Sequence, residues 1–175
     1  MAYDSLNKIA SARLGGHSSA KAMNIKSSAP IRRMSTSLNN PLEQLLGYNL
    51  RRASQTMMAD LGAELVDLDL KITEMSVLMV IEANPDVTQS EISRMLAIQR
   101  ANMVPLITQL EGRGLVRKGA SVGRAQALRL TSAGKGMVRD CHKRVSKHES
   151  RFLTALNEEQ RELLIQQLCM VWEQS

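Results

Sequence analysis

The chain has 175 residues, of which 43% are hydrophobic but only 2% aromatic, and this composition supports one domain with a core of its own. Eleven methionines favour helices that pack through adaptable side chains. No apolar run approaches the roughly 20 residues of a membrane-spanning helix, so we expect a cytoplasmic protein without a membrane partner. The two cysteines, Cys141 and Cys169, lie in helical stretches and make no disulfide framework, which suits a reducing compartment.

The formal net charge of +6 is distributed unevenly along the chain. Residues 1–41 carry a net charge of +5 and residues 86–131 carry +4, whereas the remainder is net acidic at −3. Positive charge gathered in a tail and one central block is typical of a protein that binds a polyanion. Residues 1–40 are rich in Ser, Ala, Asn, Lys and Arg, without an apolar period, and predict a basic, flexible N-terminal extension.

Helical spacing of apolar residues begins after this extension. Leucine, alanine and methionine recur every three or four residues from Leu42 to Leu61, which predicts a long first helix with Pro41 in its first turn. Thr73 is expected to open a second helix that ends before Asn84-Pro85.

The stretch "TQSE" at 88–91 has the pattern of a capping box and predicts a short third helix that ends near Leu96. A fourth helix follows and ends at Gly114. Pro105 lies inside this helix, where its missing N–H removes one bond to the Ala101 carbonyl, and we expect a kink or a loosened turn there.

A basic β-hairpin comes next. One strand is expected to begin at Leu115 and Val116, Gly119 to Gly123 to form the turn, and Ala125 to begin the second strand. A long fifth helix capped by Thr131 and a sixth capped by "NEEQ" at 157–160 complete the order α-α-α-α-β-β-α-α, a mainly α fold with a small β-hairpin wing.

This succession predicts a winged helix-turn-helix over residues 73–131, flanked by dimerisation helices over 41–72 and 132–175. In such a module the first turns of the second helix face base edges in the major groove, and polar groups at the start of the preceding helix donate to phosphates. The hairpin tip would carry Arg124 to a neighbouring minor groove. The candidate DNA-binding residues are Gln89, Ser90, Gln99, Arg100, Ala101, Asn102, Lys118, Ser121 and Arg124.

The sequence resembles the multiple-antibiotic-resistance-type (MarR) regulators through "TQSEISRMLAIQRANMVPLITQLEGRGLVRK" followed by "GRAQALRLTSAGK". The resemblance covers about residues 42–173. It implies a homodimer with intertwined first, fifth and sixth helices, whose two winged modules bind double-stranded DNA at a palindromic operator. It also implies that residues 99–102 read bases and that Arg124 is the wing arginine. The family often has an acidic residue two positions before that arginine, where this chain has Val122.

Dimerisation is also expected from the residues alone, because the apolar stripes of the terminal helices are too extensive for a small winged module to cover.

The resemblance further implies release of DNA by a small organic effector, such as an aromatic or phenolic acid or its thioester, bound between the dimer helices and the winged module. Methionines would supply an adaptable apolar lining, and an arginine or a histidine would hold a carboxylate. The candidate effector-binding residues are Arg51, Arg52, Met57, Met75, Met79 and His142.

Two other functions are alternatives to a ligand-responsive repressor. A redox-sensing regulator would need a reactive thiolate, whereas Cys141 lies on an apolar helical face and Cys169 near the C-terminus. A helical adaptor that does not bind DNA would leave the capped helix pair and the basic hairpin unexplained. No catalytic or metal-binding motif and no phosphate loop is present in the sequence, so no enzyme, metal or cofactor is expected.

Overall fold

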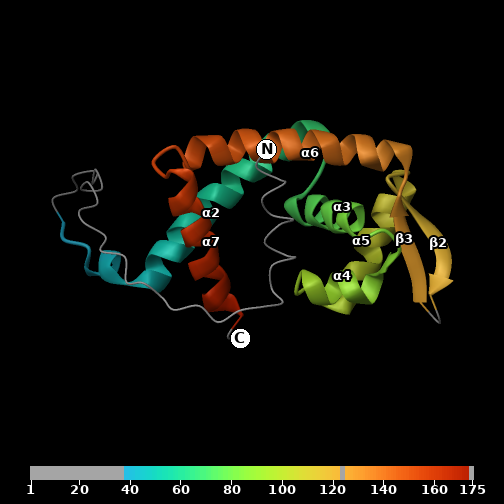
Figure 1. Cartoon of the computed structure of the whole chain (residues 1–175), viewed down its shortest axis with the longest axis horizontal. Coiled ribbons are helices and arrows are strands. Elements are labelled where there is room, and N and C mark those ends of the chain that lie inside the picture. The colour runs from blue at the N-terminus through green and yellow to red at the C-terminus, as the bar shows by residue number, and fades with distance from the viewer. Residues whose placement is uncertain (1–37, 123–124, 174–175) are drawn as a thin grey trace. The chain divides into compact units, whose positions relative to one another are not determined.

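The computed structural model describes residues 38–122 and 125–173 (Figure 1). The expected N-terminal extension, except residues 38–40, and Arg124 lie outside the described residues. No helix in the described ranges is both long and apolar enough to cross a membrane. The elements in chain order are η1 (Pro41–Gln44), α2 (Leu46–Leu65), η2 (Val66–Leu68), α3 (Ile72–Ala83), β1 (Val87–Thr88), α4 (Gln89–Met95), α5 (Arg100–Gly112), β2 (Val116–Val122), β3 (Ala125–Leu130), α6 (Ser132–Phe152) and α7 (Glu158–Trp172).

The first helix begins later than its apolar spacing predicts. Pro41–Gln44 form a single 3₁₀ turn, and Leu45 is extended at φ −87° and ψ 124° before α2 starts. The Asn49 side chain donates to the carbonyls of Glu43 and Leu45, at 2.8 and 2.9 Å, and so joins the two pieces. Among the residues of η1 and α2, only Leu61, Glu64 and Leu65 are buried, so most of this segment lies outside the core of one chain.

The predicted helix caps are confirmed at three helix starts. Thr88 Oγ1 accepts from the Glu91 N–H at 3.4 Å while the Thr88 N–H donates to Glu91 Oε2 at 2.8 Å, which starts α4. Thr131 Oγ1 accepts from the Gly134 N–H at 3.0 Å and starts α6. Asn157 and Gln160 exchange equivalent bonds at the start of α7. Each pair satisfies backbone groups that a helix end otherwise leaves unpaired.

The sheet differs from the predicted hairpin in two ways. It has three antiparallel strands in the order β1-β3-β2, because Val87 and Thr88 pair with Leu128 and Ala127 of β3. A two-residue strand is too short for an alternating pattern, so sequence reasoning missed it. The predicted turn at Gly119 to Gly123 was also wrong, because β2 continues to Val122 through an irregular register between Lys118 and Ser121. The extra residues of that irregularity are typical of a β-bulge.

One hydrophobic core lies under the winged half of the chain. It combines α3, α4, α5 and the sheet with the C-terminal end of α2 and the first half of α6. It includes the fully buried residues Leu65, Leu78, Ile92, Ile107, Leu110 and Leu128. Burying each such side chain contributes about 1.5–3 kcal/mol, so this core holds the helix pair and the wing in one unit.

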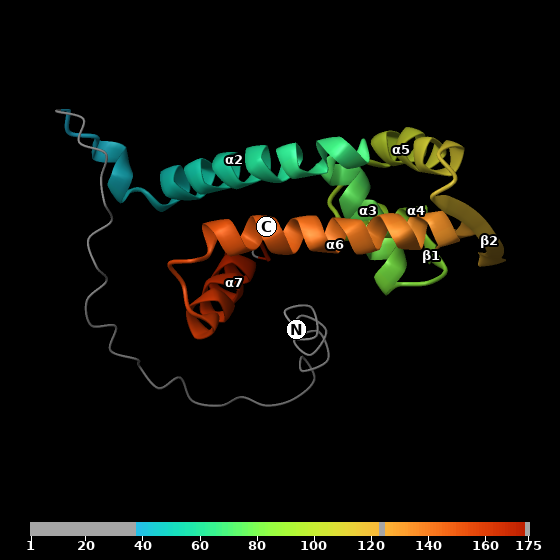
Figure 2. The same ribbon diagram turned by 90° about the horizontal axis from the view of Figure 1, so that it is seen from above.

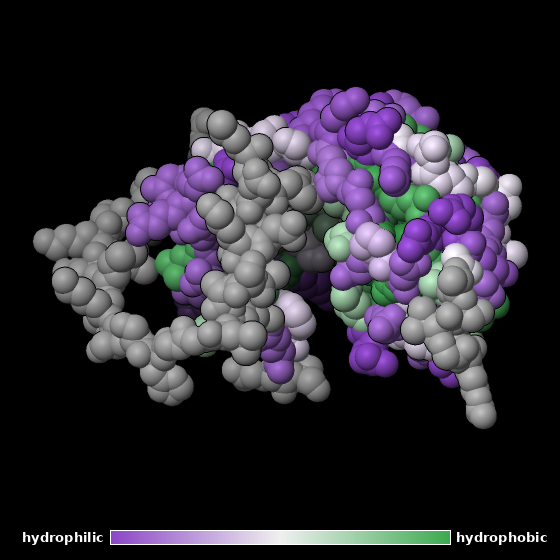
Figure 3. All heavy atoms as spheres, turned by 45° about the vertical axis from the view of Figure 1, so that its right-hand side comes forward, coloured by the Kyte–Doolittle hydropathy of each residue, from purple (hydrophilic) through white to green (hydrophobic). Residues whose placement is uncertain are grey.

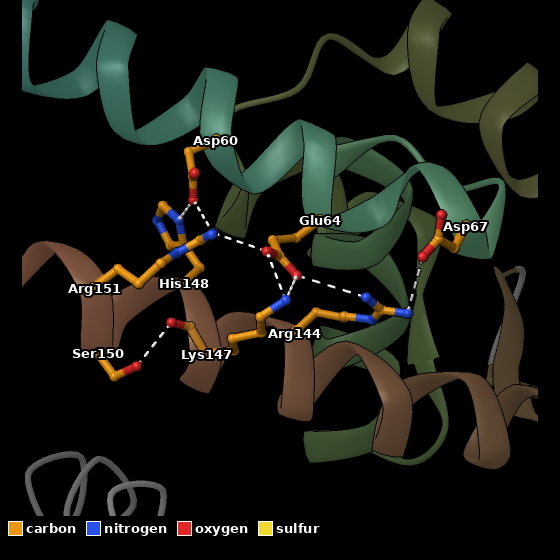
Figure 4. A network of polar contacts seen from close by, with 8 residues as sticks. All are labelled: Asp60, Glu64, Asp67, Arg144, Lys147, His148, Ser150 and Arg151. Atoms are coloured by element: carbon orange, nitrogen blue, oxygen red, sulfur yellow. Dashed lines mark hydrogen bonds and ion pairs between the residues drawn. The ribbon is translucent and has the colours of Figure 1, made fainter.

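Helices α2 and α6 lie side by side, and charged side chains join them (Figure 2). Asp60, Glu64 and Asp67 recur on one face of α2, and they meet the basic face of α6 formed by Arg144, Lys147, His148 and Arg151 (Figure 4). His148 Nδ1 and Arg151 Nη2 both lie 2.6 Å from Asp60 Oδ2, and Arg151 also binds Glu64 at 2.8 Å. The network ties the first helix to the helix that leaves the wing.

The stability of this helix pair is expected to depend on acid pH. Hydrogen bonds from His148 and from Lys147 are the main causes that hold the pKa values of Asp60 and Glu64 below their ordinary 3.8 and 4.5. The unfolded chain therefore takes up protons at a higher pH than the folded one, and stability present above about pH 4.5 is lost as the pH falls. Thermal unfolding across pH 3–7, followed by circular dichroism, should show Tm falling below about pH 4.5. Glu64→Gln should make that fall shallower, and an unchanged acid dependence would contradict this role.

Candidate nucleic-acid interface

Helix α5 has one buried face and one exposed face. Met103, Ile107 and Leu110 recur at helical spacing and are buried at 1%, 0% and 0% exposure, respectively. The exposed face begins with Gln99, Arg100, Ala101 and Asn102, the predicted base-reading residues. Burial of the first face therefore turns the start of the helix, with its polar side chains, toward solvent.

Pro105 lies inside the continuous helix α5, as its sixth residue. Both Pro105 and Ala101, one turn earlier, are exposed, so the Ala101 carbonyl that loses its helical bond lies on the solvent side. Water can satisfy that carbonyl, which lowers the cost of an interior proline. The kink itself stays a prediction.

Arg100 is held at the junction of the two helices. Its Nη2 donates to Ser90 Oγ of α4 at 2.7 Å, so two residues that were both predicted to contact DNA also contact each other. The bond restricts the guanidinium to one side of the helix pair and leaves its other donors available. Ser90 is thus a positioning residue for Arg100, with Gln89 beside it at the start of α4.

The connection between α4 and α5 is tight and partly strained. Ala97 adopts a left-handed backbone with φ 51°, a region that costs a non-glycine residue roughly 1 kcal/mol. The Ser93 hydroxyl donates to the Ile98 carbonyl at 2.7 Å and closes the turn. These local contacts set the angle at which α5 leaves α4.

The wing is anchored at its base. Lys118 of β2 lies 3.3 Å from Glu111 of α5, so this predicted DNA contact has an ion-pair partner within the protein. Ser121 lies in β2, but its side chain is outside the described part of the chain, as is all of Arg124. Their predicted roles stay predictions.

A second anchor was missed by sequence reasoning. The Arg129 guanidinium of β3 binds both carboxylate oxygens of Asp86, with Nε 2.5 Å from Oδ1, and holds the loop before β1 against the sheet. Arg129 is also the main cause that lowers the pKa of Asp86. Asp86 has φ 70°, a backbone that aspartate tolerates better than most residues. The two residues are 43 positions apart, and no local pattern connects them.

The predicted effector residues lie on three helices of one chain. Arg51 and Arg52 are exposed on α2, where Arg52 lies 5.8 Å from the centre of the Tyr48 ring. Met75 of α3 belongs to the core, and Met79 packs against it, while Met57 is half-buried on α2. His142 Nε2 of α6 lies 2.9 Å from Glu82 Oε2 of α3, so a ligand carboxylate at this imidazole would compete with Glu82.

Cys141 is buried in α6. Burial, with smaller contributions from the charges of Asp140 and Glu82, raises the pKa of its thiol to about 11. The thiol is therefore protonated at neutral pH, which opposes its use as a peroxide-sensing thiolate.

The side of the molecule that carries the wing is mainly hydrophilic, with apolar side chains between the polar ones (Figure 3). In the winged half, the start of α5 and the strand residues Lys118 and Arg129 are exposed. A polar, cationic surface over an apolar core suits contact with a hydrated polyanion.

The MarR family model matches residues 68–127, which span α3 to the first part of β3. The transcriptional repressor Rv2887 of Mycobacterium tuberculosis is 27% identical over 113 residues, which cover 63% of this chain and 81% of the relative. The repressor CouR, solved with a 23-mer DNA duplex, is 34% identical at a TM-score of 0.69 and covers 74% of this chain and 94% of its own. CouR bound to p-coumaroyl-CoA gives 34% identity and a TM-score of 0.66, and covers 74% and 93%, respectively.

Proposed function

Because the chain belongs to the MarR family of winged-helix transcriptional regulators, we propose that it is a homodimeric repressor that binds a palindromic operator and leaves it when a small organic effector binds. The solved relatives support both halves of this proposal, since CouR carries a DNA duplex in one structure and p-coumaroyl-CoA in another.

The observation that carries the DNA-binding role is the junction of α4 and α5. Four residues at the start of α5 are exposed, and the Ser90 hydroxyl orients one of them, Arg100, at 2.7 Å. An oriented guanidinium can read guanine through two parallel hydrogen bonds, and Asn102 can read adenine. Gln89 at the start of α4 would donate to a phosphate, and Ser121 and Arg124 would extend the contact along the wing.

The homodimer is supported by apolar residues that one chain leaves uncovered. No residue of α7 is buried, although the helix carries several large apolar side chains. The exposed fractions of Leu164, Ile165, Met170, Val171 and Trp172 are 39%, 42%, 64%, 50% and 62%. Leu42, Leu45 and Leu46 are similarly exposed at 45%, 54% and 68%. Exposed apolar groups on both terminal helices are costly in water, and a second copy of the chain would cover them.

The effector is proposed to be an aromatic or phenolic acid or its thioester, bound between α2, α3 and α6. Met57 and Met79 would contact its ring, and His142 or an arginine of α2 would hold its anionic group. Met75, which is part of the core, would act only by packing behind this site.

A binding selection with the full-length protein tests the proposal. Random duplexes retained by the protein should yield a palindromic consensus, and size-exclusion chromatography with light scattering should give a dimer. p-Coumaroyl-CoA and p-coumaric acid, compared in a DNA-release assay, would then test the effector class. A monomer, or retention of all duplexes equally, would overturn the proposed repressor.

A further inference from the structure

A cationic cavity of about 540 Å³ lies at the base of the wing, apart from the predicted DNA-reading residues. It is formed where the end of α3, the strands β2 and β3 and the start of α6 meet. Its lining residues are Ile81, Glu82, Pro85, Arg117, Arg129, Leu130, Lys135 and Arg139. The volume is within the range of about 300–1,000 Å³ that is usual for small-molecule sites.

The positive charges of this cavity exceed the negative ones. Four cationic side chains come from three separate elements, and Glu82 is the only carboxylate among the described lining residues. Glu82 is engaged with His142 at 2.9 Å, and the nearby Asp86 binds Arg129 through both oxygens. In the described ranges, no carboxylate lies within ion-pair distance of Arg117, Lys135 or Arg139, although the charges of Arg117 and Arg139 contribute to lowering the pKa values of Asp86 and Asp140, respectively. Like charges held around one hollow repel one another, and a bound anion would relieve that repulsion.

The position of these cations is unsuited to the operator contact proposed above. Arg117 and Arg129 face each other in the β2–β3 register, whereas the described strands end toward the tip at the pair Val122 and Ala125. Five residues of strand separate these pairs, a length of about 17 Å. The cations therefore lie at the end of the wing that joins α6, not at the end that reaches DNA.

The lining also has an apolar side. Ile81 is buried, Leu130 is 8% exposed, and Pro85 adds a rigid ring to the lining. Guanidinium groups match phosphate oxygens through paired hydrogen bonds, and Lys135 adds a mobile point charge. A ligand that uses both sides of the cavity needs phosphate groups and an apolar or planar organic part.

We propose that this cavity is a binding site for a phosphorylated organic molecule of about nucleotide size, held by Arg117, Lys135 and Arg139 with its organic part against Ile81, Pro85 and Leu130. The cavity lining includes none of the proposed effector residues and none of the start of α5, although its Glu82 contacts the effector candidate His142 at 2.9 Å. It would give the regulator a second small-molecule input at the joint between the wing and α6.

Calorimetry of the full-length protein with ADP, pyrophosphate and adenosine tests the site. ADP should bind more tightly than pyrophosphate, and adenosine should bind least, because only ADP uses both sides of the cavity. Lys135→Ala with Arg139→Ala should weaken ADP binding by at least about tenfold, since both changes remove charge-assisted bonds. Lys143→Ala is the matched control, because Lys143 is an exposed cation of α6 that is paired with Asp140 at 2.9 Å and lies outside the lining.

Three results would overturn the site. ADP and pyrophosphate could fail to bind at millimolar concentration, or Lys143→Ala could weaken ADP as much as the double variant. The double variant could also lose operator affinity while ADP binding is unchanged, which would make these cations a DNA contact. ADP binding is measured without DNA, so its failure leaves the proposed repressor function intact, and the operator selection is a separate test.

Discussion

Arg100→Ala is expected to lower operator affinity by about 10- to 100-fold, because one bidentate contact to a base is worth about 1–3 kcal/mol. The structure adds a reason for a large effect, since Ser90 Oγ holds the guanidinium at 2.7 Å before DNA arrives. Fluorescence anisotropy with a labelled operator measures the loss. The variant should remain a folded dimer, because Arg100 is exposed and contributes nothing to the core.

Two further variants test whether Arg100 reads bases, contacts phosphate only, or acts merely as one more positive charge. Ser90→Ala should reduce operator affinity less than Arg100→Ala does. It should also narrow the difference in affinity between the operator and duplexes that carry single base changes. Lys143→Ala removes an equal charge from α6 and should leave affinity unchanged. If Arg100→Ala weakens all duplexes by the same factor, Arg100 contacts phosphate only and does not read bases.

Gly134→Ala is expected to be the most destabilising single substitution that we propose. A Cβ at this position would lie 2.0 Å from the Leu115 carbonyl oxygen, a backbone atom that no rotamer change can move away. The start of α6 would have to shift, together with the bond from the Gly134 N–H to Thr131. We expect a loss of about 3 kcal/mol or more in the free energy of unfolding, measured by chemical denaturation.

Gly136→Ala is the matched control, two residues further along the same helix. Its added Cβ would meet only the Arg139 guanidinium at 3.6 Å, an ordinary contact. Alanine has the higher helix propensity, so stability should rise by about 0.5–1 kcal/mol. Equal destabilisation by both substitutions would show that helix propensity, and not the approach to Leu115, determines the result.

Local patterns predicted the helices well because their causes are local. Thr88 with Glu91, and Asn157 with Gln160, are three residues apart, and each pair bonds as the capping pattern predicts. The exposed start of α5 was predicted from the winged-helix pattern, and the structure adds that Met103, Ile107 and Leu110 are buried together on the opposite face. The short strand Val87–Thr88 was missed because its partner, β3, lies about 40 residues away and two residues carry no period.

The same distinction applies to the charged residues. Helical spacing places the acidic positions 60, 64 and 67 on one face of a helix and the basic positions 144, 147, 148 and 151 on one face of another. The sequence therefore contains two charged faces. Nothing in that spacing says that the two faces meet, or that Glu64 is thereby 9% exposed. The ion pair between Asp86 and Arg129 and the cavity at the base of the wing are likewise products of packing.

The amino-acid sequence by itself determined the winged helix-turn-helix class. Capping patterns and apolar periods, which act over a few residues, indicate the capped helix pair, the basic hairpin and the long amphipathic end helices. Only the tertiary structure decided which charged side chains contact other groups of the protein and which remain without an ion-pair partner. Lys118, predicted to contact DNA, lies against Glu111, and Arg100 is oriented by Ser90, whereas three cations around the cavity have no ion-pair partner in the described part of the chain. The physical reason is that a charge acts over a few ångströms in space, whereas the partners Glu111 and Lys118 are 7 positions apart along the chain and Asp60 and Arg151 are 91 apart.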